Sequence, residues 1–198
     1  MGLPTTLFIA IGAILAALVA GFFSFLNLVS SKENKVSEFR QGWIDGLRDE
    51  IATFTSSTQA LARFWMAKDD IEGEKEFLEI TQTYYEKTVE SLTKIQLRLN
   101  PIRAENHPDS DESKLLKAIH VSRDYFNSGN YRDAAKSSLD IRSAAAPLLK
   151  VEWERVKLGE EGYQEIRRNA MRTIRSGIVL LAVLAVAAVV IPLVTAAM

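Results

Sequence analysis

The chain has 198 residues, of which 47% are hydrophobic and 25% are charged, and its formal net charge is −1. A net charge this close to zero excludes a nucleic-acid-binding protein that acts through bulk positive charge. The sequence has no cysteine, which excludes disulfides and thiolate metal sites. All charged side chains lie between Lys32 and Arg175, and the two uncharged apolar ends exclude an ordinary soluble domain.

The first apolar end, Leu7 to Val29, is long enough to cross a hydrocarbon core, which requires about 20 residues of helix. A cleaved signal peptide is the alternative interpretation. Signal peptides have a basic start and a shorter apolar region of roughly 7–15 residues, whereas Met1 to Thr6 contains no Lys or Arg. We therefore predict that residues 1–30 form a retained transmembrane helix.

The second apolar end, residues 177–198, has a similar length and is predicted to be a second transmembrane helix, with Pro192 near its far end. Both ends carry small residues at helical spacing, which allow helices to approach closely in lipid. The predicted packing positions are Gly12, Ala16, Ala20, Ala182 and Ala185. The pattern does not decide whether they pack within one chain or between chains.

Basic residues flank the charged middle of the chain on both sides. They are Lys32, Lys35 and Arg40 after the first apolar end and Arg167, Arg168, Arg172 and Arg175 before the second. Because Lys and Arg concentrate in cytoplasmic loops, we predict a two-pass protein of the bacterial inner membrane with both termini periplasmic. Residues 31–176 are then cytoplasmic, although the rule is weaker for loops longer than about 60 residues.

An apolar stripe begins directly after the first predicted span and repeats every three or four residues, as in an amphipathic helix. Its members are Val36, Phe39, Trp43, Leu47, Ile51, Phe54, Thr58, Leu61 and Trp65. No proline interrupts residues 30–68, so we expect the membrane helix to continue through them. The Ser/Thr-rich stretch 53–58 is the weakest part and a place for a bend.

Three further helices are predicted after an acidic turn at residues 69–73. One ends at Asn100–Pro101, and the next begins near Asp109, with Glu112 three residues later. The third begins near Tyr131 and must bend before the membrane, at Pro147 or at Gly159/Gly162. The expected fold is all-α, an antiparallel helical bundle continuous with the two transmembrane helices.

The sequence contains no catalytic motif, so we predict a non-enzymatic protein without a cofactor. His107 and His120 are 13 residues apart and lack the spacing of a metal site. Trp43 and Trp65 are expected to belong to the core of the bundle. The arginines before the second span are expected to contact lipid headgroups, either for orientation alone or as a lipid site.

Two segments resemble known proteins, and so does the order of the predicted elements. Residues 30–50, SSKENKVSEFRQGWIDGLRDE after a membrane span, resemble a stretch of uncharacterised bacterial membrane proteins, which implies a bacterial or prophage origin. Residues 115–147, with Gly129-Asn-Tyr-Arg-Asp-Ala134, are similar to one tetratricopeptide unit, although Ser138 replaces the expected aromatic residue. A generic helical hairpin is the alternative there.

The order of span, helical bundle and span is similar to the sensor half of bacterial chemoreceptors, whose periplasmic bundle binds small ligands.

Three functional hypotheses follow from the sequence. The first is a membrane protein that presents a cytoplasmic bundle to protein partners or to further copies of itself, with membrane lipids and no nucleic acid as partners. The second is a periplasmic ligand sensor, and the third is a membrane-permeabilising effector, which the lack of polar residues in both spans opposes.

Overall fold

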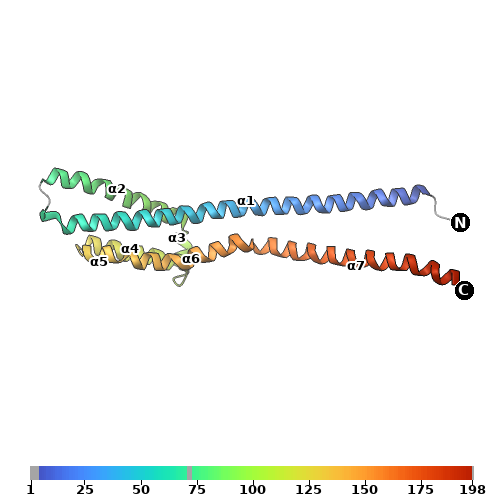
Figure 1. Cartoon of the computed structure of the whole chain (residues 1–198). Coiled ribbons are helices and arrows are strands. Elements are labelled where there is room, and N and C mark those ends of the chain that lie inside the picture. The colour runs from blue at the N-terminus through green and yellow to red at the C-terminus, as the bar shows by residue number, and fades with distance from the viewer. Residues whose placement is uncertain (1–4, 71–72, 198) are drawn as a thin grey trace. The chain divides into compact units, whose positions relative to one another are not determined.

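The computed structural model describes residues 5–70 and 73–197 (Figure 1). Within these ranges it contains helices and no β-strand, which confirms the prediction of an all-α fold. The elements are α1 (Thr5–Met66), η1 (Lys68–Asp70), α2 (Glu74–Arg98), α3 (Pro101–Asn106), α4 (Asp111–Asn127), α5 (Tyr131–Lys136), α6 (Ser138–Leu158) and α7 (Glu161–Ala197).

The chain divides into two compact units. The first contains the described residues up to Ser37 together with those from Leu158 onward, and the second is Glu38–Lys157. The second unit contains the core, and the first contains both apolar ends.

Helix α1 is uninterrupted over 62 residues, which confirms that the first apolar segment continues as helix into the charged middle. The bend expected at residues 53–58 does not interrupt it. Thr55 donates from Oγ1 to the Ile51 carbonyl at 2.8 Å, so its hydroxyl is satisfied inside the helix. In the part of the chain that the structure describes, one helix is long and apolar enough to cross a membrane, at Gly12–Met66 of α1. A membrane span and a signal sequence both fit that finding.

The second predicted span lies inside α7, which runs as helix to Ala197. The side chains of several of its residues lie outside the described ones, and the span stays a prediction.

The turns between helices follow local chemistry that the sequence predicts in part. Helix α4 is capped by Ser110, whose Oγ accepts from the Ser113 N–H at 3.2 Å, and the predicted start at Asp109 is therefore wrong by one residue. Pro101 opens α3 instead of leading into a loop, because a first-turn proline loses no helix hydrogen bond. Helix α6 runs through Pro147 without restarting and ends before Gly159.

Gly159 has φ +80°, the left-handed conformation that ends helices and that glycine adopts without steric cost. A Cβ at this position would also lie 2.9 Å from Glu33 Oε1 and 2.8 Å from the Tyr163 ring. Glu33 Oε1 accepts from the Glu160 N–H at 2.8 Å, just before α7 begins. Gly159 thus permits both the turn and the approach of Glu33, and the break between α6 and α7 lies at one of the positions where the sequence predicted a bend.

One apolar core in the second unit combines side chains from α1, α2, α4 and α6. Its buried members are Leu47, Ile51, Phe54, Leu92, Ile95, Leu99, Leu115, Ile119, Ile141, Ala145 and Leu148. Most of the predicted stripe of α1 is buried or half-buried here. The exception is Phe39, which is 79% exposed, while Ile44, which the stripe omits, is completely buried.

Outside this apolar core the buried residues of the second unit are Ile44, Glu50, Leu61, Ala62, Phe77, Ala104, Ala134 and eight small residues that carry hydroxyl groups. The eight are Thr55, Ser57, Thr58, Thr81, Ser91, Ser122, Ser137 and Ser138. Several of these hydroxyls bond to their own helix, as Thr81 does to the Phe77 carbonyl at 2.7 Å. Two exceptions join different elements: Ser137 Oγ donates to Ser122 Oγ at 2.7 Å, and Gln59 Nε2 donates to Ser138 Oγ at 2.6 Å. We call this part of the second unit the hydroxyl-rich layer.

Candidate functional site

The basic residues before the second apolar end lie on α7, and all four are exposed. With Leu158, Gln164 and Met171 they line a groove of about 430 Å³. None of the four forms an ion pair with any residue that the structure describes. Unpaired guanidinium groups beside an uncharged apolar run are the arrangement that anionic headgroups attract. These arginines are Arg167, Arg168, Arg172 and Arg175.

The basic residues after the first apolar end have a different environment. Lys32 and Lys35 are exposed on α1, whereas Arg40 is half-buried and contacts Glu152 of α6. Glu152 also accepts from Arg155 Nη1 at 2.6 Å. Arg40 therefore joins two helices of the second unit, a role that its flanking position did not predict.

The predicted small-residue positions are uncovered in the single chain. Gly12, Ala16, Ala20 and Ala182 are exposed, and a Cβ at Gly12 would meet no atom within 4 Å. The side chain of Ala185 lies outside the described ones. Packing through these positions stays a prediction.

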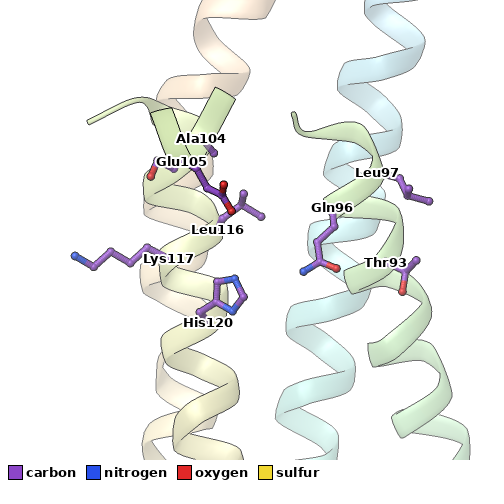
Figure 2. Close-up of a pocket in the computed structure, with 9 residues that line it drawn as sticks. Thr93, Gln96, Leu97, Ala104, Glu105, Leu116, Lys117 and His120 are labelled. Carbon is purple, nitrogen blue, oxygen red and sulfur yellow. The ribbon is translucent and has the colours of Figure 1, made fainter. Parts of the chain in front are cut away.

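A groove of about 630 Å³ lies in the second unit between α2 and the segment α3–α4. Figure 2 shows Thr93, Gln96 and Leu97 on the α2 ribbon, with Leu116, Lys117 and His120 on the opposite ribbon. Ala104 and Glu105 of α3, with Ser113 of α4, complete the lining. The lining combines apolar atoms with a carboxylate, an ammonium group and an imidazole, which suits an extended peptide or a partner helix.

Two strongly exposed apolar side chains lie on the elements that form this groove. Leu97 of α2 lines the groove and is 81% exposed, and Ile102 of α3, which is not one of the lining residues, is 70% exposed. Outside the apolar ends, Phe39 at 79% is the other described large apolar residue that is at least 70% exposed. Apolar side chains displayed beside a groove are typical of a protein-binding surface.

A buried ion pair joins α1 to α2. Arg98 donates from Nε to both carboxylate oxygens of Glu50 at 2.7 Å, and the Glu50 side chain is only 9% exposed. The guanidinium lies directly against Gly46, where a Cβ would overlap its Nη2 and Cζ atoms. The absence of a side chain at Gly46 thus allows Arg98 to reach Glu50.

This ion pair between Glu50 and Arg98 was not predicted from the sequence. Glu50 lies three residues after Leu47 and directly before Ile51, so it borders the apolar stripe of α1. Its position at the edge of a buried stripe could have indicated an ion pair, because a buried charge requires a partner. The position of that partner, 48 residues later on α2, depends on the helix pairing.

Four aromatic residues of the second unit pack together around Trp65, near the end of α1. Trp65 stacks on Tyr131 with centroids 5.6 Å apart and meets the edge of Phe77 at 5.2 Å. Tyr131 also contacts Phe126 at 5.2 Å, and Lys68 Nζ lies 5.1 Å from the Trp65 ring centroid. Trp65 is half-buried in this aromatic group and lies outside the apolar core, whereas Trp43 packs against that core, as expected.

The two histidines do not form part of a cluster. His107 is exposed in the loop after α3, and His120 is exposed on α4 in the groove of Figure 2. Among the described residues there is no group of three or more His, Asp or Glu side chains that could hold a metal ion.

Comparison of the chain with models of protein families, with curated proteins and with solved structures gives no match. The three resemblances drawn from the sequence stay predictions. Within residues 115–147 the second helix of the tetratricopeptide-like unit is divided into α5 and α6 at Ser137.

Proposed function

We propose that this protein is a non-enzymatic bacterial inner-membrane protein that presents a cytoplasmic antiparallel helical bundle to protein partners or to further copies of itself. The observation that carries the proposal is the continuity of α1, which is apolar enough to cross a membrane in its first part and supplies core residues in its second. The absence of Lys and Arg from residues 1–6 supports a retained span, because a signal peptide has a basic start.

The two-pass topology is supported by the second uncharged apolar run at residues 177–198 and by the unpaired arginines that precede it. Basic residues on the flank of a span favour the cytoplasmic side. The predicted domains remain 1–30, 31–176 and 177–198.

Topology is tested by cysteine labelling, because the natural sequence has no cysteine to interfere. Asp109→Cys is placed in the exposed loop before α4, next to the capping Ser110 but without removing it, and Ala197→Cys is placed near the other end. A membrane-impermeant maleimide applied to intact cells should label Ala197→Cys and should label Asp109→Cys only after lysis. Labelling of Asp109→Cys in intact cells would contradict the orientation and favour the ligand-sensor hypothesis.

The partner surface is proposed at the groove between α2 and α3–α4. A photo-crosslinking amino acid at Leu97 should give specific adducts in intact cells, with a partner or with a second copy of the chain. The matched control is Leu78, which is also exposed on α2, at 56%, but does not line the groove. Equal adducts from both positions, or none from Leu97, would remove the support for this surface. Depolarisation of cells on overexpression would favour the membrane-permeabilising effector instead.

A further inference from the structure

A second cavity in the second unit is more enclosed than the groove of Figure 2 and has a volume of about 290 Å³. Three helices form its walls. Phe54, Thr58 and Leu61 come from α1, four residues from α2 and three from α4. The α2 and α4 residues are Tyr85, Thr88, Val89, Leu92, Arg123, Phe126 and Asn127. The volume is near the lower end of ligand pockets, which is roughly 300 Å³, and well above the ~150 Å³ that already accepts benzene.

The wall contains one buried polar atom without a partner. Thr58 is 6% exposed, and its Oγ1 is the one fully buried side-chain nitrogen or oxygen in the described residues that forms no hydrogen bond. The other threonine of the wall differs, because Thr88 donates from Oγ1 to the Tyr84 carbonyl at 2.8 Å. A buried hydroxyl that lacks a partner is destabilising, and a bound group that accepts its hydrogen bond would remove that cost.

The wall also contains a cation without a counterion. Arg123 is exposed on α4 and forms no ion pair with any described residue. The remaining lining is mainly apolar, with Phe54, Leu61 and Leu92 buried and Phe126 half-buried. An apolar cavity with one cation and one unsatisfied hydroxyl is complementary to a molecule that has an apolar body and a single anionic group.

We propose that this cavity binds a small monocarboxylate with a short apolar tail. The tail packs against the aromatic and aliphatic side chains, and the carboxylate accepts hydrogen bonds from the Thr58 hydroxyl and the Arg123 guanidinium. A carboxylate has acceptor positions for both donors at once. This binding activity does not depend on the topology or on the protein partner proposed above.

The test uses the full chain in phosphatidylcholine nanodiscs, with octanoate as the probe and empty nanodiscs as the reference in titration calorimetry. Octanoate should bind saturably, whereas octylamine, which has the same chain length and the opposite charge, should not. Arg123→Gln and Thr58→Val should each weaken octanoate binding about tenfold or more, because each removes a hydrogen bond to a charged group.

Two matched variants, Arg132→Gln and Thr83→Val, change exposed residues of the same types outside the cavity and should leave the affinity unchanged. Arg123 is on the surface, so its variant remains informative even if a change at Thr58 impairs folding. Absence of saturable octanoate binding, equal binding of octylamine, or unchanged affinity in Arg123→Gln would each overturn the proposal.

Discussion

The buried pair between Glu50 and Arg98 provides a quantitative test of how α1 and α2 are joined. Replacing Arg98 with Met keeps the aliphatic length of the side chain and removes its charge. Glu50, whose side chain is 9% exposed, then becomes a buried carboxylate without the Nε–H donor that its two oxygens share. Removing one member of a fully buried pair typically costs about 3–5 kcal/mol.

The exposure of Arg98 lowers this value. Its side chain is 32% exposed, so water reaches the site and can partly solvate Glu50 in the variant. We therefore expect Arg98→Met to reduce the free energy of unfolding of the second unit by about 2–3 kcal/mol. The double variant Glu50→Met/Arg98→Met has no buried charge, and its stability should lie within about 1 kcal/mol of the natural protein.

Urea unfolding of the full chain in detergent, followed by tryptophan fluorescence, measures this directly. All three tryptophans, Trp43, Trp65 and Trp153, lie within Glu38–Lys157, so the signal reports on the unit that contains the pair. A free energy of unfolding for Arg98→Met within about 0.5 kcal/mol of that of the natural protein, the usual range of surface substitutions, would refute this role of the pair. A double variant that is no more stable than Arg98→Met would refute it as well.

Three other predictions concern helix packing, pH and topology. Gly42→Ala should stabilise α1 by up to about 1 kcal/mol in urea unfolding, because a Cβ there meets no atom within 4 Å. Gly46→Ala should gain little or lose stability, because its Cβ overlaps Arg98. Equal gains in stability from the two variants would contradict the role of Gly46. The hydrogen bond from Asn130 is the main cause that lowers the pKa of Asp133, and Lys136 lowers it further. The stabilisation that Asp133 gives to the start of α5 should therefore be complete above the pKa of the unfolded chain. It should disappear as the pH falls through the lower pKa of the folded chain. Asp133→Asn should abolish that acid-dependent loss in amide exchange of α5, and an unchanged pH profile would refute the assignment. Changing the four α7 arginines to Gln should make a fraction of the Asp109→Cys molecules accessible to labelling in intact cells. Unaltered labelling would show that these arginines do not set the orientation. The four residues are Arg167, Arg168, Arg172 and Arg175.

Helix periodicity was sufficient to predict the fold class and the part of the core that α1 supplies. Leu47, Ile51 and Phe54 recur at spacings that bury one face of α1, and all three are in the core. Phe39 fits the same spacing and is exposed, because periodicity gives the direction of a side chain but not where the covering helices end. The core boundary depends on tertiary packing, which no local pattern contains.

The candidate sites were less predictable for a related reason. The four α7 arginines are adjacent in sequence and were identified from it. The cavity between α1, α2 and α4 combines Thr58 with Arg123, which are distant in sequence, and their proximity follows only from helix pairing. The break at Ser137 was missed because its neighbours in α5 and α6 are ordinary helix-forming residues and no proline or glycine marks it.

The division of the second unit into an apolar core and a hydroxyl-rich layer has a consequence for local opening. Burial of Leu, Ile and Phe side chains holds the helices together near Leu47 and Ile95, at roughly 1.5–3 kcal/mol for each side chain. Hydroxyls such as that of Thr81 are satisfied within their own helix and add little attraction between helices. Amide protons near Thr81 should therefore exchange through smaller openings than those near Ile95, so that two segments of α2 differ in local stability.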